Sequence, residues 1–506
     1  MKRTAASLAI IAVTLSLSAH PVLSRDLNEA MRGGGRSVVF LDQINKASIV
    51  MLSEAGLVSP PVAQRIAAGL GRVIAGERAN GVERSADYLD FEPKLIVAVG
   101  PDASRLHIGR RRQDMGATIA RMSLRVGLLK EQEALIGIRE RLLARADQNK
   151  ETIVPAYTHG VQAQPTTFAH YLLAWEAAFA RDSARLQAAF ERVIRSPLGA
   201  AALGTSSFPI DRKRLADLLG FEGPVENAYD ANHIASVDSA LEVASALEIS
   251  AIQLGQFAQD IHAQYAAPAP WLLLTEGRLT GVSSIMPQKR NPAAIEQLRT
   301  QSSMMAGEMQ TVFLVAHNVR TGMFDYRGYD PVPSERPLQV YGLVQQVLDG
   351  MVIDKDRALA EVDADYSTTT EIADTLLRDA DVPFRIGHHY ASALTNYGRA
   401  RGLQLKDIPY AEAARLYRED VKQDFPLTEA GFKEAISPAH MVFGSKGLGG
   451  PQLAEVARMI AEGRAALGAD AAWVKSANDR LNAAGATLDR AIEALALNGG
   501  TGSSGR

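Results

Sequence analysis

Apolar residues recur every three or four positions over long stretches of this 506-residue chain. Residues 115 to about 146 contain no proline, and Met122, Val126 and Leu129 follow one another at spacings of four and three. Such spacing places these side chains on one face of a helix. The pattern therefore predicts one long helix over this stretch.

Three further long helices are predicted in the same way. One begins just after residue 165 and ends near 196, one covers roughly 235 to 263, and one runs from 291 to about 319. The last begins with Asn291 and Pro292, which are typical of a helix cap and first turn. Alternation typical of strands is nearly absent. We therefore expect an all-α fold with a central bundle of long helices.

The chain divides into five predicted segments. Residues 1–24 carry two basic residues, then an apolar run too short to cross a bilayer comfortably, then small residues, as in a signal peptide cleaved before Arg25. Export into the periplasm or secretion is therefore expected. Residues 25–113 are predicted to form an N-terminal domain of short helices and loops. The other segments are 114–365, the central bundle; 366–496, a C-terminal domain of shorter helices broken by prolines; and 497–506, a disordered Gly/Ser-rich tail.

Composition narrows the possible ligands. The chain has 54 Lys plus Arg against 57 Asp plus Glu, a net charge of −3, which provides no general attraction for nucleic acid or an anionic membrane. The absence of cysteine excludes disulfides, thiol nucleophiles and zinc–cysteine sites. His388 and His389 are neighbours on a predicted helix, cannot face the same way and are poor metal ligands as a pair. No metal site is indicated, and a small-molecule ligand fits best.

The most informative stretch is 281–292, which reads Gly-Val-Ser-Ser-Ile-Met-Pro-Gln-Lys-Arg-Asn-Pro. A loop of this kind presents backbone N–H groups and the Lys289 ammonium to an anion, and the helix that follows adds its dipole. A serine hydroxyl in such surroundings can be held ionised. Taken alone, such a loop is more often a simple capped turn, so its meaning depends on the rest of the chain.

This stretch closely resembles the signature of the fumarase/aspartase superfamily, Gly-Ser-Ser-x-Met-Pro-x-Lys-x-Asn. Residues 106–114 resemble the argininosuccinate lyase segment His-Thr-Gly-Arg-Ser-Arg-Asn-Asp, and residues 157–168 resemble its Tyr-Thr-His block. Weaker resemblance to the same branch reaches the C-terminal segment. The resemblance implies a three-domain, all-α chain of this superfamily, similar to argininosuccinate lyases.

The resemblance also implies a reaction, the anti β-elimination of an N-substituted aspartate to fumarate and an amine. Ser283 matches the family's base, and His159 matches a histidine linked to protonation or charge stabilisation of the leaving group. The family needs no organic cofactor, and it forms homotetramers in which three chains build each active site. Positions that match substrate-binding residues are Arg112, Gln113, Thr158, Ser284, Lys289 and Asn291.

Each of these assignments has a structural alternative. His159, expected at the start of a helix, could cap or pack there. At least one of the arginines in 110–112 belongs to a solvated charge run, and Arg112 aligns with the substrate-facing arginine of the family. His107 could be structural.

Several family positions carry other residues. Gln113 replaces an asparagine, and Val282 replaces the signature glycine, which is expected to stiffen the loop. Groups that hold the arginine half of argininosuccinate are missing near 233–236 and 325–333. A buried charge without its partner is costly, so argininosuccinate should bind poorly here. The fumarate half of the site is better kept.

Three interpretations follow. The chain is an argininosuccinate lyase with a changed site, or a lyase for another N-substituted aspartate, similar to ethylenediamine-disuccinate (EDDS) lyase. Export favours the second, because arginine synthesis belongs in the cytoplasm. The third is a non-catalytic, crystallin-like use of the fold, which the retention of Ser283, Lys289 and His159 disfavours.

Overall fold

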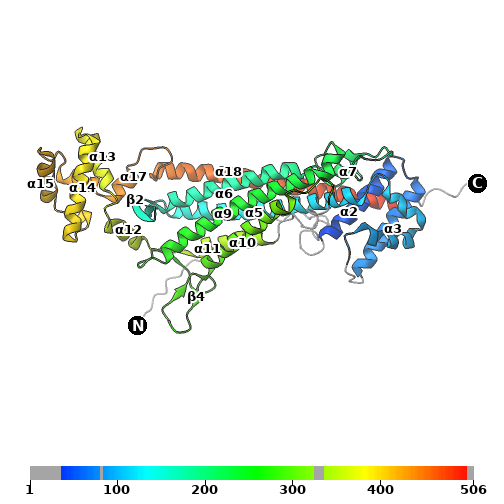
Figure 1. The fold of residues 1–506 in the computed structure, drawn as a ribbon, viewed down its shortest axis with the longest axis horizontal. Coiled ribbons are helices and arrows are strands. Elements are labelled where there is room, and N and C mark those ends of the chain that lie inside the picture. The colour runs from blue at the N-terminus through cyan, green and yellow to red at the C-terminus, as the bar shows by residue number, and fades with distance from the viewer. Residues whose placement is uncertain (1–35, 80–83, 324–334, 498–506) are drawn as a thin grey trace, which may run out of the picture. The chain divides into compact units, whose positions relative to one another are not determined.

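The computed structural model describes residues 36–79, 84–323 and 335–497 and consists mainly of α-helices (Figure 1). The predicted signal peptide, positions 325–333 and the tail beyond 497 lie outside these residues. Within the described ranges, strands occur only in three two-stranded sheets. The all-α prediction is confirmed. No described helix is both long enough and apolar enough to cross a membrane.

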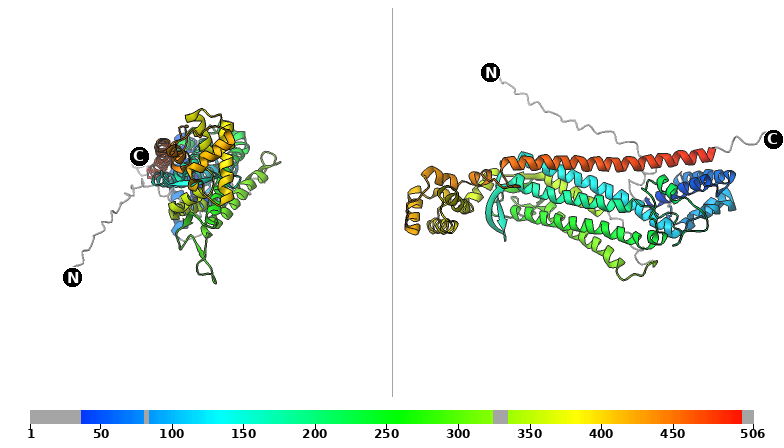
Figure 2. Two further views of the ribbon diagram at one scale, coloured as in Figure 1. Left: turned by 90° about the vertical axis from the view of Figure 1, so that its left-hand side faces the viewer. Right: turned by 90° about the horizontal axis from the view of Figure 1, so that it is seen from above.

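The four predicted long helices are confirmed as α5 (Arg112–Gln148), α6 (Phe168–Val193), α9 (Ala235–Tyr265) and α10 (Ala293–Ala316). Helix α9 packs against α6 and α10, and α10 packs against α11 (Arg336–Gly350). Figures 1 and 2 show α6, α9 and α10 lying side by side. Their apolar faces bury residues such as Phe179, Leu254 and Leu298. These helices form the predicted bundle because packing against one another buries the apolar side of each helix.

The start of α10 differs from the prediction. Asn291 does not cap the helix but ends a short strand, and Pro292 occupies the position before the first turn. Proline is tolerated there because the first helical N–H groups have no partner inside the helix.

The chain folds into two compact units whose segments alternate along the sequence. Among the described residues, one unit comprises 36–79, 84–119, 195–231 and 476–497, and the other comprises 120–194, 232–323 and 335–475. The linear three-domain division stays a prediction. The first unit contains α2 (Arg36–Glu54), α3 (Pro60–Ala79), α4 (Tyr88–Val99), the 3₁₀ helix η1 (Pro101–His107), α7 (Arg212–Leu218) and part of α8 (Ala228–His233).

Helices α2 and α3 have 19 and 20 residues, so they are longer than the short helices predicted for this region. They pack against each other and bury Phe40, Ile44 and Leu70. The region looked irregular in the sequence because glycines and prolines punctuate it, but Gly69, Gly71 and Gly76 lie within α3 and Pro93 lies within α4 without ending these helices.

The second unit holds the three small antiparallel sheets. Strand β1 (Ile153–Thr158) pairs with β2 (Val161–Thr167), and β3 (Leu272–Leu274) pairs with β6 (Met351–Ile353). Strand β4 (Gly281–Val282) pairs with β5 (Arg290–Asn291). The hydroxyl of Thr167 accepts a hydrogen bond from the N–H of His170 and caps α6, so β2 leads directly into that helix.

The C-terminal segment begins with shorter helices, as predicted. They are α13 (Thr369–Ala380), α14 (Phe384–Arg401), η3 (Leu405–Asp407), α15 (Tyr410–Val421), α16 (Glu429–Ala435) and α17 (Pro438–Phe443). Helix α12 (Lys355–Ala364) precedes them, at the end of the predicted central segment. Tyr390, Tyr417 and Phe432 are buried in one apolar cluster among them.

The prediction of shorter helices up to residue 496 is wrong for the last part of the chain. Residues Leu453–Leu497 form one helix, α18, of 45 residues. No proline follows Pro451, and Val456, Ile460 and Leu481 are buried. The prolines that break the preceding segment had suggested an interruption that does not extend this far.

Candidate active site

The serine predicted to act as base lies in a loop that joins strands β4 and β5. Gly281 pairs with Asn291 and Val282 pairs with Arg290, so the intervening residues project as one hairpin loop. The Ser283 hydroxyl accepts hydrogen bonds from the N–H groups of Ile285 and Met286, at 3.4 and 3.1 Å. Two backbone donors therefore converge on this oxygen, and they would stabilise negative charge on it.

The other signature residues surround this serine on the same loop. Ser284 and Lys289 are exposed, and Asn291 is half-buried. The N–H of Lys289 donates to the carbonyl of Met286 at 3.0 Å, which closes the loop. Within the part of the chain that the structure describes, the Lys289 ammonium forms no ion pair, so it is available to an anionic ligand.

The loop is held to its neighbours through Arg290. Its guanidinium forms an ion pair with Glu276 at 2.9 Å and donates to the carbonyl of Pro287 at 2.8 Å. The Tyr265 hydroxyl donates to the carbonyl of Arg290 at 2.8 Å. These contacts fix the base of the loop and leave its tip exposed.

The replacement of the signature glycine by Val282 causes no backbone strain. Val282 lies in β4 with an ordinary extended backbone and does not adopt a positive φ. A β-branched side chain suits an extended strand. The side chain is 81% exposed, so it also meets no steric barrier within this chain.

Thr158 and His159 lie at the tip of the β1–β2 hairpin, and not at the start of a helix as predicted for His159. His159 and Gly160 form the turn and have φ values of 55° and 75°. Positive φ at both turn residues is typical of a two-residue hairpin loop, and it follows the twist of the strands. Both Thr158 and His159 are exposed. A cap or packing role within a helix is therefore excluded for His159.

Hydrogen bonds anchor this hairpin to two helices. The Tyr157 hydroxyl donates to the Glu361 carboxylate of α12 and lies 3.5 Å from Oε1 of Gln264, at the end of α9. The Gln162 amide donates to the carbonyl of Val362 at 3.2 Å. Burial, together with the neighbouring Glu361, raises the pKa of Tyr157 to about 12. Tyr157 therefore remains a hydrogen-bond donor at neutral pH.

The three arginines at positions 110–112, in the first unit, make different contacts. Arg110 is buried, its guanidinium carbon lies 4.6 Å from the centre of the Tyr88 ring, and it donates to the Ser48 hydroxyl at 3.0 Å. Arg111 donates to the carbonyl of His107 at 3.1 Å. Both arginines therefore have structural partners.

Arg112, the predicted substrate ligand, is 60% exposed and forms an ion pair with Asp87 at 2.6 Å. Gln113, half-buried, follows it in the first turn of α5. Arg111 and Arg112 are both exposed, and the guanidinium of Arg112 is paired with a carboxylate, whereas that of Arg111 donates to backbone carbonyls. His107 packs edge-on against Tyr88 with ring centroids 4.4 Å apart, which fits the structural interpretation.

Asp114, the last residue of this block, fixes the start of α5. Its buried carboxylate accepts hydrogen bonds from the N–H groups of Arg111, Gly199 and Ala201, at 2.7, 2.8 and 3.0 Å. Burial raises the pKa of Asp114 to about 6, and the three N–H groups oppose this change. The aspartate thus ties the first block to the segment around Gly199.

The structure of one chain brings the site residues together only within blocks. Among the described residues, no hydrogen bond or ion pair joins Thr158 or His159 to the Ser283 loop. Each of the three blocks lies at the start of a different long helix, namely α5, α6 and α10. The replaced positions near 233–236 fall at the junction of α8 and α9, where His233 is buried and Ile234 is 47% exposed.

No group of three or more His, Asp or Glu side chains suited to a metal ion occurs in the described ranges. His389 forms a hydrogen bond with Asp420 at 2.9 Å. Three side chains near the hairpin had no signal in the sequence analysis: Asp260, Trp271 and Glu361. They come from α9, the segment before β3 and α12, and nothing in the local sequence connects them.

Solved structures with the same fold define the class of protein. The chain is similar to an EDDS lyase solved in complex with formate, with a TM-score of 0.83 and 27% identity over 90% of this chain and 91% of that one. It is likewise similar to a variant of EDDS lyase with bound fumarate, with a TM-score of 0.82 and 27% identity over 90% and 91% of the two chains. A lyase family model matches residues 82–307. The chain is a lyase with the fumarase/aspartase fold.

The sequence comparisons specify the branch. A model of the argininosuccinate lyase C-terminal region matches residues 366–442. The argininosuccinate lyase of Methanosarcina acetivorans is 32% identical over 463 residues, 89% of this chain and 90% of the relative. The chain belongs to the argininosuccinate lyase family, and it is a carbon–nitrogen lyase, of a family whose reaction releases fumarate. The non-catalytic interpretation is therefore set aside.

Proposed function

We propose that this lyase cleaves the carbon–nitrogen bond of an N-substituted aspartate by anti β-elimination and releases fumarate, with Ser283 as the base. The observation that carries the proposal is the pair of N–H groups that donate to the Ser283 hydroxyl within the superfamily signature. A serine has a pKa far too high for a base at neutral pH, unless donors stabilise its alkoxide. The loop supplies two such donors, and Lys289 adds a positive charge nearby.

In the proposed reaction, Ser283 takes a proton from the carbon beside a carboxylate of the substrate. The electron pair left behind is held as an aci-carboxylate with two negative charges. Preorganised donors must stabilise it, and this is the larger electrostatic task. Ser284, Lys289, Asn291 and Thr158 hold the substrate carboxylates.

The aci-carboxylate then expels the amine. The bond from carbon to nitrogen breaks, the carbon–carbon double bond of fumarate forms, and His159 protonates or stabilises the leaving nitrogen. Its place in an exposed hairpin turn suits a group that meets a ligand from outside its own chain. Arg112 and Gln113 complete the substrate contacts.

We propose that the active protein is a homotetramer in which three chains supply the three blocks of each site. Apolar side chains on the outer faces of α9 and α10 support an association between chains. Ile252, Met304 and Leu314 are 53%, 46% and 74% exposed. Exposed apolar side chains that share neighbouring helices are typical of a surface that another chain covers. The exposed serine loop and hairpin tip would each meet groups from other chains in such an assembly.

Two substrates compete in this proposal. Argininosuccinate is one, and an aminopolycarboxylate such as EDDS, which contains N-substituted aspartate units, is the other. The buried His233 and the apolar Ile234 favour the second, because they replace polar family residues expected near the leaving group. The similarity in fold to EDDS lyase supports it as well.

The test is a measurement of fumarate release from argininosuccinate, EDDS and a series of other N-substituted aspartates. We expect release from EDDS or another aminopolycarboxylate at a higher kcat/KM than from argininosuccinate. Efficient release from argininosuccinate alone would establish the first substrate instead. Release from none of them would contradict the proposed reaction.

We also propose that the chain is exported and that residues 1–24 are removed. Lys2 and Arg3, the apolar run and the small residues before Arg25 support this. N-terminal sequencing of the protein from a fractionated cell tests it. The expected result is a mature chain that begins at Arg25 outside the cytoplasm, whereas an intact Met1 in the cytoplasm would refute it.

A further inference from the structure

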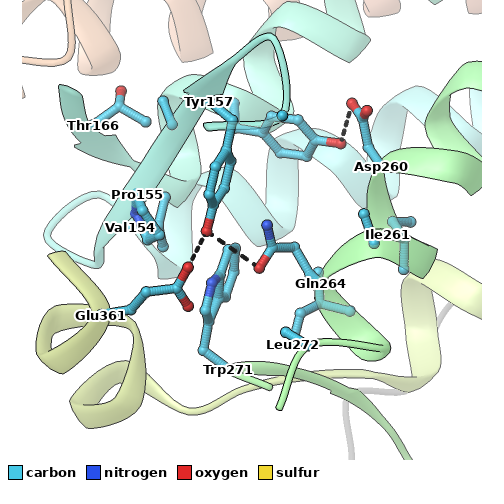
Figure 3. A pocket seen from close by; sticks show the side chains of 15 residues that line it. Val154, Pro155, Tyr157, Thr166, Asp260, Ile261, Gln264, Trp271, Leu272 and Glu361 are labelled. Atoms are coloured by element: carbon cyan, nitrogen blue, oxygen red, sulfur yellow. Dashed lines mark hydrogen bonds between the residues drawn. The ribbon is translucent and has the colours of Figure 1, made fainter. Parts of the chain in front are cut away.

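A cavity of about 500 Å³ lies beside the β1–β2 hairpin, apart from the serine loop (Figure 3). Strand β1, the last turns of α9, the segment before β3, and α12 all contribute to its walls. A volume of this size suits a small organic molecule. The residues that give it chemical character are Tyr157, Tyr171, Asp260, Gln264, Trp271 and Glu361.

The cavity combines aromatic walls with negative charge. Three aromatic side chains line it, and none of its lining residues is Lys, Arg or His. Its two carboxylates, Asp260 and Glu361, form no ion pair with any described residue. Each instead accepts a hydrogen bond from a neutral tyrosine, Asp260 from Tyr171 at 3.1 Å and Glu361 from Tyr157 (Figure 3). A carboxylate beside aromatic faces, without a cation, attracts a positive ligand.

Trp271 adds a second, independent feature. Its side chain is only 4% exposed, and its indole N–H forms no well-aligned hydrogen bond among the described residues. Its interaction with the Tyr157 hydroxyl lowers the pKa of that phenol and so opposes the effect of burial. A buried donor whose hydrogen bond is poorly aligned is unfavourable, and a better-placed acceptor brought by a ligand would reduce this cost. Figure 3 shows the Trp271 indole beside the Tyr157 hydroxyl and the Glu361 carboxylate, on the wall of the cavity. A ligand that reaches Glu361 can therefore also reach this donor.

We propose that this cavity binds a small organic ammonium or guanidinium ion with a flat apolar body and a hydrogen-bond acceptor. The positive group pairs with Asp260 or Glu361, the apolar body lies between the aromatic walls, and the acceptor meets the Trp271 N–H. The site does not depend on Ser283 or on the proposed elimination. Its ligand is distinguished from the substrate by charge, because fumarate and aspartate carboxylates would be repelled by the two acids.

The test uses three probes of nearly the same shape on the purified full-length protein, measured by isothermal titration calorimetry. Tyramine carries an ammonium, tyrosol carries a hydroxyl in its place, and 3-(4-hydroxyphenyl)propionate carries a carboxylate. Tyramine is expected to bind, with a Kd at least fivefold lower than that of tyrosol, and added salt should weaken it. The anion is expected not to bind. Equal affinity for tyramine and tyrosol would overturn the proposal without any variant.

Substitutions locate the site. Glu361→Gln and Asp260→Asn should each raise the Kd of tyramine about fivefold, since each removes one charge partner at a partly exposed position. Trp271→Phe should raise it as well, because the indole donor is lost. Asp356→Asn is the matched control, since Asp356 is exposed in the first turn of the same helix as Glu361, and its Kd should stay unchanged. Folded variants, checked by circular dichroism, that all bind tyramine as the wild type does would refute the site.

Ser283→Ala separates this inference from the proposed function. The variant should lose fumarate release and keep the wild-type Kd for tyramine. Failure of tyramine to bind to an active enzyme would overturn the cavity alone. Absence of fumarate release from a protein that binds tyramine would overturn the elimination alone.

Discussion

At the scale of single residues, the proposed role of Ser283 depends on the backbone groups around its hydroxyl. The Ser283 hydroxyl has no basic side chain as a hydrogen-bond partner in the described part of the chain, and its donors are the N–H groups of Ile285 and Met286. Backbone donors do not titrate and do not need to reorient when charge develops. If Ser283 is the base, as we propose, the loop fixes its environment before any substrate arrives.

Glu131 is a carboxyl group that burial keeps neutral, whereas the donors around Ser283 would favour a charged oxygen. It is 1% exposed in α5, its Oε2 has no partner among the described residues, and burial raises its pKa to about 8. A carboxyl whose pKa is raised on folding stabilises the fold fully below about pH 4.5, and this contribution is lost as pH rises through 8. The side chain therefore costs stability at neutral and basic pH.

We predict that Glu131→Gln removes this dependence. Between pH 5 and pH 8 the wild type should lose about 3 kcal/mol more stability than the variant, which corresponds to a few degrees in Tm. Thermal unfolding at the two pH values checks this, with Glu140→Gln, exposed on the same helix, as control. A Tm difference between wild type and Glu131→Gln that stays constant from pH 5 to pH 8 would contradict the assignment.

At the scale of elements, the sequence pattern predicts the long helices well and the small elements poorly. The apolar spacing of Met122, Val126 and Leu129 belongs to one helix face, and the structure buries all three. The β1–β2 hairpin was missed because Pro155 and Pro165 argue against a strand. They are tolerated because, in a two-stranded sheet, each strand has an unpaired edge.

Part of the candidate site could be predicted from the sequence, and part could not. Ser283, Lys289 and Asn291 are found from one continuous motif, since the loop that holds them is local. The cavity beside the hairpin was not predictable, because Asp260 and Glu361 are about a hundred residues apart and meet only after the helices pack. Local spacing carries no information about such a meeting.

The hairpin turn provides a prediction at this scale. Gly160 has a φ of 75°, and a Cβ there would meet no atom within 4 Å, so Gly160→Ala tests backbone strain alone. We expect a loss of about 1 kcal/mol in stability and a fall in kcat, because the turn that presents His159 is distorted. Thermal unfolding and steady-state kinetics measure both effects.

Gly71→Ala is the matched control. Gly71 lies in α3 without a positive φ, and a Cβ there also meets open space. This variant should be as stable as the wild type or slightly more stable, since alanine favours a helix. Equal effects of the two substitutions would show that the turn is not strained by a side chain.

At the scale of the whole molecule, the account requires an assembly of chains. The serine loop and hairpin tip are exposed and share no hydrogen bond within the described part of one chain. The apolar outer faces of α9 and α10 remain open to solvent, with Leu314 74% exposed. A site completed by neighbouring chains explains both observations together.

We predict that Leu314→Glu disrupts this assembly, because a charge on a covered apolar surface is costly to bury. The wild type should have four times the mass of one chain in solution, and the variant a lower mass, a retained helical signal and no fumarate release. Light scattering after size-exclusion chromatography measures the mass. Val97→Glu, at a 90% exposed position of α4, is the control and should remain tetrameric and active. A wild type that is active as a monomer would refute the shared site.

The most direct test of the central claim is the rate of fumarate formation by wild type and Ser283→Ala with the best substrate of the N-substituted aspartate series. If Ser283 is the base, the substitution should reduce kcat by at least about a thousandfold, with the tetramer and the Tm unchanged, since base catalysis and its supporting donors are lost together. A Ser283→Ala variant that releases fumarate at a rate close to that of the wild type would contradict the account.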